Sequence, residues 1–219
     1  MNADPKGVLH LIPVTLGADD VRAVVPPATL AVVAALDYFI VENEKSARRF
    51  LKNAPHPKPL RQLQFGLFDK NSDAQRALEL LQPLTAGRSA GVLSEAGCPA
   101  IADPGALLVE AAHRLHIRVA PHVGPSSLLL ALMAAGFNGQ RFAFHGYLPV
   151  ARDECRAEIA KLEHESRARG VTQIFIETPY RSDALLHTLL KTCDGKTALC
   201  IASDLALATE SGRSAPISE

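Results

Sequence analysis

The stretch from Leu93 to Gly105 holds the densest group of residues suited to binding a small molecule. It follows a short apolar run at residues 90–93, typical of a buried strand, and precedes a helix-like segment at residues 106–115. Asp103 is placed to cap that helix, and Pro104 to occupy its first position. A loop of small residues and prolines therefore crosses the carboxyl end of a strand, where open α/β sheets bind ligands.

A second segment of the same kind follows at residues 122–127. It reads His-Val-Gly-Pro-Ser-Ser and lies between a short apolar strand at residues 117–120 and an apolar helix at residues 126–135. Two such turns in succession indicate a built pocket at one edge of a sheet.

Charge balance limits the classes of partner. The chain has 23 basic and 23 acidic side chains and a formal net charge of +0. This balance argues against a surface that is an electrostatic platform for nucleic acid as a whole. A local basic patch stays open at Arg48, Arg49, Lys52, Lys58 and Arg61, although a solvated helix face explains that cluster more simply.

Cysteine usage and apolar runs point to a cytoplasmic protein without metal. The 4 cysteines form no C-x-x-C pair and no zinc spacing. The sequence shows no cleavable signal pattern and no apolar run of the ~18 residues that span a bilayer, so we expect reduced thiols and no membrane contact. We expect Cys98 to have a packing role rather than to be a nucleophile, because its neighbours imply no histidine partner.

Short apolar strands alternate with helices, which predicts parallel βαβ units in an α/β fold. The expected strands cover residues 8–13, 38–41, 63–67, 90–93, 117–120, 142–145, 171–176 and 197–201. The expected helices cover residues 28–36, 45–52, 72–84, 106–115, 126–135, 153–169 and 182–191, the third capped by Ser72.

The turn at Gly124 predicts two domains, residues 1–122 and 123–219, and we expect the second to lack a closing strand after Ser203.

Several common catalytic motifs are missing from the sequence. The sequence contains no G-x-x-x-x-G-K-[ST] loop, no G-x-G-x-x-G turn after a strand and no G-x-S-x-G elbow. These absences disfavour a P-loop hydrolase, a Rossmann dinucleotide enzyme or Rossmann-type methyltransferase, and a serine hydrolase.

Six segments in collinear order resemble a known family. They are Ile12–Gly17, Val41–Leu51, Ser94–Gly105, Val123–Ser127, Phe142–Pro149 and Ile174–Arg181. Together they resemble the tetrapyrrole methylase superfamily of S-adenosylmethionine-dependent methyltransferases, and within it most nearly the 16S ribosomal RNA 2′-O-ribose methyltransferase I branch. The resemblance covers almost the whole chain. It implies two α/β domains with a cofactor cleft between them (class III), and a homodimer.

The resemblance also implies which residues contact S-adenosylmethionine. One group would line the first side of the cleft: Pro13, Gly17, Ser94, Glu95, Ala96, Gly97, Cys98 and Pro99. The other group would line the opposite side: Gly124, Pro125, Ser126, Ser127, Ile176, Glu177, Thr178 and Pro179.

These residue types suit a methyl donor. Gly97 and Gly124 let the backbone approach a ligand closely, and free N–H groups at the start of the helix after Gly124 suit its charged end. Methyl transfer is an in-line displacement, so catalysis is chiefly positioning, which contributes up to about 7–11 kcal/mol.

The sequence departs from the ribose-methylating pattern at the segment expected to hold the catalytic base and in the loop at residues 94–99 expected to bind the cofactor. Where that branch reads Glu-Asp-Thr-Arg, this chain has Glu42-Asn43-Glu44-Lys45, and Asn43 cannot accept a proton. Glu42 and Glu44 are therefore the candidate bases, although helix-start carboxylates often only cap or face solvent. His145, near the expected acceptor side, is a third catalytic candidate, and a satisfied polar residue at a strand end is the alternative.

The acceptor stays open at this point. The first expectation is RNA, and the second is a small heterocycle such as a tetrapyrrole. Changes at Glu95 and Cys98, where the branch reads Asp and Thr, leave a third hypothesis: a degenerate paralogue that binds the cofactor as a sensing or interaction module.

Overall fold

The computed structural model describes residues 6–219, which form two compact units, one ending at Ser126 and the other beginning at Ser127. The boundary predicted from the sequence lies between His122 and Val123, four residues earlier. Each unit has its own strands and its own hydrophobic core.

The first unit is built on a five-stranded parallel sheet, as the alternating pattern predicts. Its strands are β1 (Val8–Leu11), β2 (Tyr38–Val41), β3 (Gln64–Leu67), β4 (Ala90–Leu93) and β5 (Arg118–Pro121). They lie in the order β3-β2-β4-β1-β5, and every pair is parallel. All residues of β2 and β4 are buried, as expected for inner strands covered on both faces.

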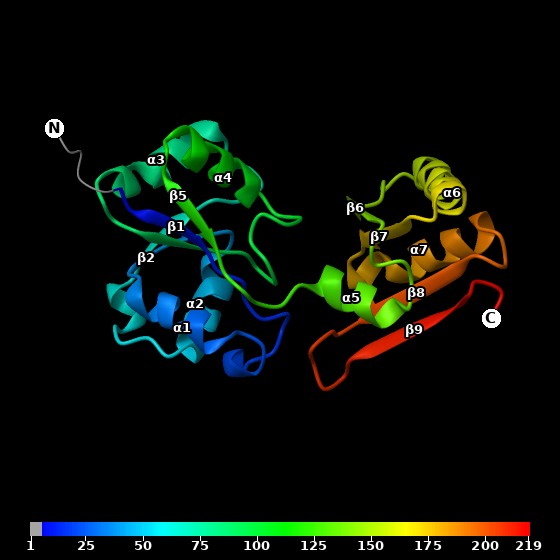
Figure 1. Cartoon of the computed structure of the whole chain (residues 1–219), viewed down its shortest axis with the longest axis horizontal. Helices are drawn as coiled ribbons and strands as arrows, with labels where there is room; N and C mark the ends of the chain where they lie inside the picture. The colour runs from blue at the N-terminus through cyan, green and yellow to red at the C-terminus, as the bar shows by residue number, and fades with distance from the viewer. Residues whose placement is uncertain (1–5) are drawn as a thin grey trace. The chain divides into compact units, whose positions relative to one another are not determined.

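Helices cover both faces of this sheet (Figure 1). On one face, α1 (Pro27–Ala35) and α2 (Glu44–Asn53) pack with Phe39 of β2. On the other, α3 (Ala74–Thr85) and α4 (Gly105–Arg114) pack with Ile40. Short 3-10 turns lie at Val21–Ala23 and Leu60–Gln62. The chain therefore leaves neighbouring strands β1 and β4 toward opposite faces, and such a reversal opens a crevice at the carboxyl ends of the strands.

Two helix starts differ in detail from the sequence prediction. The cap of α3 is Asp73, whose Oδ1 accepts the backbone N–H of Arg76 at 2.9 Å, because Ser72 is engaged by the side chain of Asp69. Helix α4 begins at Gly105, so Pro104 holds the cap position. Asp103 still does the predicted capping, since its Oδ1 accepts the N–H of Gly105 at 2.7 Å.

The second unit contains two separate two-stranded sheets. Strands β6 (Phe142–Tyr147) and β7 (Thr172–Ile176) are parallel, and β8 (Ala198–Ser203) pairs antiparallel with β9 (Ser211–Pro216). Its helices are α5 (Ser127–Ala135), α6 (Arg152–Arg169) and α7 (Pro179–Thr192). Buried residues of α6, α7 and the loop after β6 form its core: Leu148, Cys155, Ile159, Leu162, Leu185 and Leu189.

The expectation of no strand after Ser203 is wrong. Strand β9 pairs with β8 along its whole length, from Ser211 opposite Ser203 to Pro216 opposite Ala198. Its sequence, Ser-Gly-Arg-Ser-Ala-Pro, is almost entirely exposed and shows no apolar alternation. Backbone pairing with β8 and a hydrogen bond from the Ser214 hydroxyl to the carbonyl oxygen of Ala135 hold this strand, so a hydrophobic pattern does not reveal it.

Within residues 6–219, the helices are too short or too polar to cross a lipid bilayer.

Candidate active site

The loops that follow β1 and β4 are joined by backbone hydrogen bonding. The N–H of Val14 donates to the carbonyl oxygen of Gly97 at 2.9 Å, and the two residues form an isolated antiparallel bridge. Ser94, which is 6% exposed, donates its hydroxyl to the carbonyl oxygens of Ala96 and Gly97, each at 3.3 Å. These bonds hold the predicted loop of small residues in one conformation at the carboxyl edge of the sheet.

Glycine is required where these loops meet. Gly97 has a φ of +69°, and a Cβ there would lie 3.2 Å from Cδ2 of Leu16. A Cβ on Gly124, in the loop after β5, would lie 2.3 Å from Cβ of Pro13. The loops after β1, β4 and β5 therefore approach one another at backbone distance. Three segments that the sequence analysis assigns to cofactor binding are thus adjacent in the first unit: 13–17, 94–99 and 124–126.

Side chains fix the segment before the unit boundary. The hydroxyl of Thr29, at the start of α1 and 2% exposed, donates to the carbonyl oxygen of Val123 at 2.8 Å. The thiol of Cys98 donates to the carbonyl oxygen of Pro125 at 3.4 Å. Burial, and then the charge of Asp103, raise the pKa of Cys98, which keeps the thiol protonated and agrees with a packing role. Sequence reasoning missed Thr29, whose only signal is a hydroxyl at the start of an apolar helix.

The loop between Gly97 and α4 carries backbone strain. Ala100 and Ala102 have φ values of 66° and 61°, a region that costs an L-residue about 1–2 kcal/mol. Asp103 holds the strained turn, since its Oδ1 accepts the N–H of Ala100 at 2.8 Å. Such strain clusters at functional sites. Nothing in the sequence indicates it.

Two carboxyl groups lie beside a small cavity at the ends of β2 and β4. The cavity, about 10 Å³, is lined in part by Glu42, Ser94 and Asp103. Burial raises the pKa of Glu42, and the charges of Asp103 and Glu95 raise it further, while the N–H of Glu95 opposes the shift. Burial also raises the pKa of Asp103. Glu42 is thus a weaker acid than an exposed glutamate, as a general base must be to accept a proton readily.

The neighbours of Glu42 have other partners. Asn43 caps α2, because its Oδ1 accepts the N–H of Lys45 at 2.9 Å. Glu44, the first residue of α2, is exposed and accepts a hydrogen bond from Nε of Arg48 at 2.7 Å. Of the two candidate bases in this segment, Glu42 alone lies at the small cavity.

The other predicted site residues belong to the second unit. Ser127 opens α5, and Ile176 ends β7. Glu177 follows, with an Oε1 that accepts the N–H of Thr178 at 2.7 Å and an Oε2 3.1 Å from Nη2 of Arg181. Pro179 is the first residue of α7. The bonds of Glu177 thus fix the turn from β7 into α7.

His145 lies on β6 in the same unit. One of its ring nitrogens, Nε2, is hydrogen-bonded to Oε1 of Gln173 on β7. This bond orients the imidazole across the parallel strand pair and engages one of its two nitrogens.

No group of three or more histidine, cysteine or acidic side chains within residues 6–219 is arranged to hold a metal ion.

The chain has clear curated relatives, although no family model matches it. Ribosomal RNA small subunit methyltransferase I of Vibrio cholerae is 30% identical over 220 residues, which cover 98% of this chain and 71% of the relative. The protein of the same name from Escherichia coli O157:H7 is 30% identical over 214 residues, with the same coverages. That of Xylella fastidiosa is 33% identical over 175 residues, which cover 80% of this chain and 60% of the relative.

Solved structures agree on the fold. The methyltransferase CobJ matches with a TM-score of 0.65 at 18% identity, over 97% of this chain and 87% of CobJ. Uroporphyrin III C-methyltransferase from Thermus thermophilus matches with a TM-score of 0.58 at 16% identity, over 96% and 89% of the two chains. With the relatives above, these likenesses confirm the resemblance seen in the six segments. The chain is a methyltransferase and belongs to the ribosomal RNA small subunit methyltransferase I family of the tetrapyrrole methylase superfamily.

Proposed function

We propose that this methyltransferase transfers a methyl group from S-adenosylmethionine to a ribose 2′-hydroxyl of small-subunit ribosomal RNA. The observation that carries the cofactor assignment is the meeting of three loops at Gly97 and Gly124, where a Cβ would collide. Glycine at these positions lets the three loops pack closely together at the carboxyl end of a parallel sheet, which is the edge where such sheets bind ligands. The names of the curated relatives support RNA as the acceptor.

The residues of the first unit fit such a cofactor. Ala96 and Gly97 would present backbone N–H groups to it, because their carbonyl oxygens already accept hydrogen bonds within the protein, and the anchored segment before Ser126 would form a second side. The cofactor would supply an activated methyl group, and the protein would position that group against the acceptor hydroxyl.

The acceptor hydroxyl needs help to lose its proton. We assign that role to Glu42, because its raised pKa and its place at the ends of β2 and β4 suit a general base. Asn43 cannot take the proton, and Glu44 is bonded to Arg48.

Radiolabelled cofactor tests the proposal. The full chain is incubated with S-[methyl-³H]adenosylmethionine and, separately, with small ribosomal subunits, total protein and the small-molecule fraction of an extract. Label should enter RNA and remain in alkali-resistant dinucleotides, because a 2′-O-methyl group blocks hydrolysis of the neighbouring phosphodiester bond. The Gly97→Arg variant, which fills the meeting point of the loops, should abolish incorporation.

Other outcomes would overturn the acceptor or the activity. Label confined to small molecules would favour a heterocyclic acceptor such as a tetrapyrrole. Calorimetric binding of the cofactor without transfer to any fraction would favour a sensing module. The resemblance also leads us to propose a homodimer, which sedimentation equilibrium would measure directly.

A further inference from the structure

A basic groove lies between α6 and α7 in the second unit. It has a volume of about 500 Å³, within the range of ligand sites. Arg152 and Arg156, one helical turn apart on α6, line one side, and Arg181 and Lys191 of α7 line the other. The only carboxylate among the lining residues is Glu177. With histidine neutral, the groove carries a net charge of +3.

Most cations of this groove are not paired with a carboxylate in the described part of the chain, unlike other cations of α6. Lys161, Arg167 and Arg169 each form an ion pair with a glutamate three or four residues earlier on the same helix. Within the described residues, Arg152 and Arg156 form no such pair, and neither does Lys191. Glu177 is already engaged by Arg181 at 3.1 Å and by the N–H of Thr178. The groove therefore holds three exposed cations that form no ion pair with any carboxylate among residues 6–219.

Apolar side chains line the groove, and an exposed tyrosine lies one position before Arg181 at the start of α7. Buried Cys155 and Leu185 line the groove, and so does Val150, which is 80% exposed. Tyr180 precedes Arg181 in the chain and is 84% exposed. Exposed aromatic rings beside cations are the surfaces on which unpaired bases stack while phosphates bind the charges.

We propose that this groove binds the phosphate backbone of a single-stranded RNA segment. The choice of RNA rather than another polyanion rests on the proposed function. Arg152, Arg156 and Lys191 contact the phosphates, and Tyr180 offers its ring to a flanking base. The groove would then help to hold the acceptor RNA, and of its lining residues only Glu177 is also among those that the resemblance assigns to the cofactor.

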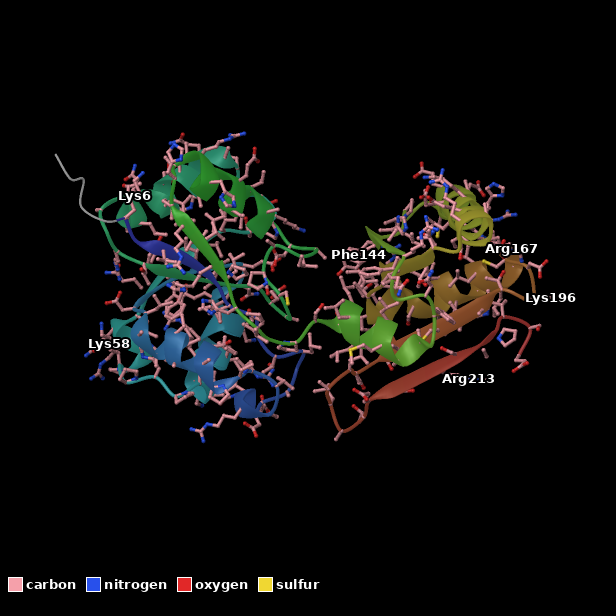
Figure 2. The ribbon with its side chains drawn as sticks, in the orientation of Figure 1. Lys6, Lys58, Phe144, Arg167, Lys196 and Arg213 are labelled. Atoms are coloured by element: carbon pink, nitrogen blue, oxygen red, sulfur yellow. The ribbon has the colours of Figure 1, made fainter. Side chains whose placement is uncertain are left out.

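A matched pair of double variants tests this site. Arg152→Gln/Arg156→Gln removes two cations of the groove. Lys196→Gln/Arg213→Gln removes two exposed cations of the same unit outside it, and Figure 2 labels both. All four side chains are exposed, so both variants should fold, as near-UV circular dichroism would verify. Fluorescence anisotropy with a short labelled single-stranded RNA, over a salt series, gives the affinity.

Each contacting cation contributes about 0.7 to the slope of log affinity against log salt for single-stranded RNA. The groove variant should therefore lower the steepness of that slope by about 1.4, and the control variant should leave it unchanged. Adding Lys191→Gln to the groove variant should lower it by about 0.7 more. Equal slopes for the groove and control variants would overturn the site.

Two further readouts separate this site from the proposed function. Calorimetry should show the same affinity for S-adenosylmethionine in all variants. If the groove variant loses RNA affinity but the wild type labels no RNA, the groove is an RNA-binding site and the proposed methylation of RNA is wrong. If the wild type labels RNA and the groove variant binds RNA normally, the groove fails and the function stands. A wild type that binds no RNA at all overturns both.

Discussion

His10 on β1 and His122 after β5 are hydrogen-bonded to each other, with Nδ1 of His10 2.9 Å from Nε2 of His122. The two rings are stacked, with centroids 5.1 Å apart. Such a bond needs a donor nitrogen on one ring and an unprotonated nitrogen on the other, so full protonation of both rings breaks it. The pair therefore links two neighbouring parallel strands through a bond that depends on pH.

The stability of the protein should fall as the pH is lowered below about 6.5. Burial, then His122, then Arg118 lower the pKa of His10, and burial lowers the pKa of His122. A histidine whose folded pKa is depressed binds fewer protons in the native state than in the unfolded state. Its stabilising contribution is therefore complete above the unfolded pKa and is lost on acidification. Urea unfolding at a series of pH values measures this dependence.

The His10→Gln/His122→Gln variant should flatten that pH dependence between about pH 5 and 7. His164→Gln, at an exposed position of α6 outside the pair, serves as the control and should keep the wild-type curve. Identical pH dependence in the paired variant and the wild type would contradict the assignment.

Gly97→Ala should weaken cofactor binding as well as the fold. The positive φ costs about 1–2 kcal/mol, and the new Cβ must displace Leu16. We expect calorimetry to show about tenfold weaker binding of S-adenosylmethionine, equivalent to about 1.4 kcal/mol. Gly136→Ala is the matched control, because Gly136 has a φ of +71° with nothing within 4 Å. Gly136→Ala should lose stability only. Equal loss of cofactor affinity in both variants would refute the assignment of Gly97 to the cofactor site.

Thr29→Val should destabilise the first unit by about 1 kcal/mol, because it removes the buried hydroxyl that binds the carbonyl oxygen of Val123. Chemical denaturation measures the change. The control is Thr85→Val, which removes an exposed hydroxyl bonded to Gln82 and should change stability by less than about 0.5 kcal/mol. If the control lost as much unfolding free energy as Thr29→Val, the buried hydrogen bond to Val123 would contribute no more to stability than an exposed one.

Asn43→Ala should cost about 1 kcal/mol, since it removes the cap of α2. Asn43→Asp keeps the acceptor and places a negative charge at the N-terminus of the helix, which should stabilise it by about 0.3–1 kcal/mol. Thermal unfolding of the two variants beside the wild type should therefore rank Asp above Asn above Ala. An Ala variant as stable as the wild type would show that the side chain at residue 43 does not act as a cap.

Glu42→Gln should lower kcat by about 10²–10⁴ while cofactor affinity stays unchanged, because a general base is lost. The variant should also be more stable at pH 7. The pKa of Glu42 is raised in the folded protein, so its ionisation above about pH 4.5 opposes folding. Steady-state kinetics and urea unfolding measure the two effects. Loss of rate in Glu44→Gln instead, with full rate in Glu42→Gln, would assign the base to the exposed carboxylate.

Strong hydrophobic patterns predicted most of the fold. The buried strand at Tyr38–Val41 has the predicted bounds, and most other elements begin or end within a few residues of the prediction. Strand β9 was missed because its pairing is carried by backbone groups alone. Helix α7 begins at Pro179 rather than Ser182, because the proline after Glu177 fits the first turn of a helix as well as a loop.

The candidate site was predictable only in part. Motif order placed Gly97 and Gly124 in one site, and the contacts of the first unit bring their loops together. The strain at Ala102 and the pairing of His10 with His122 depend on residues brought together by the whole sheet, the histidines being 112 positions apart. Pattern reasoning along the chain does not reach such contacts.

The order of strands in the first sheet has a consequence for the newly made chain. Strand β1 has two neighbours, β4 and β5, and pairs with residues 90–92 and 118–121. During synthesis from the N-terminus, the first strand therefore has no partner until residues 90–92 have been made. Strands β2 and β3 can pair with each other much earlier. During biosynthesis the apolar strand β1 therefore stays unpaired until β4 is made. At that stage a chaperone would have the most exposed apolar backbone to shield from aggregation.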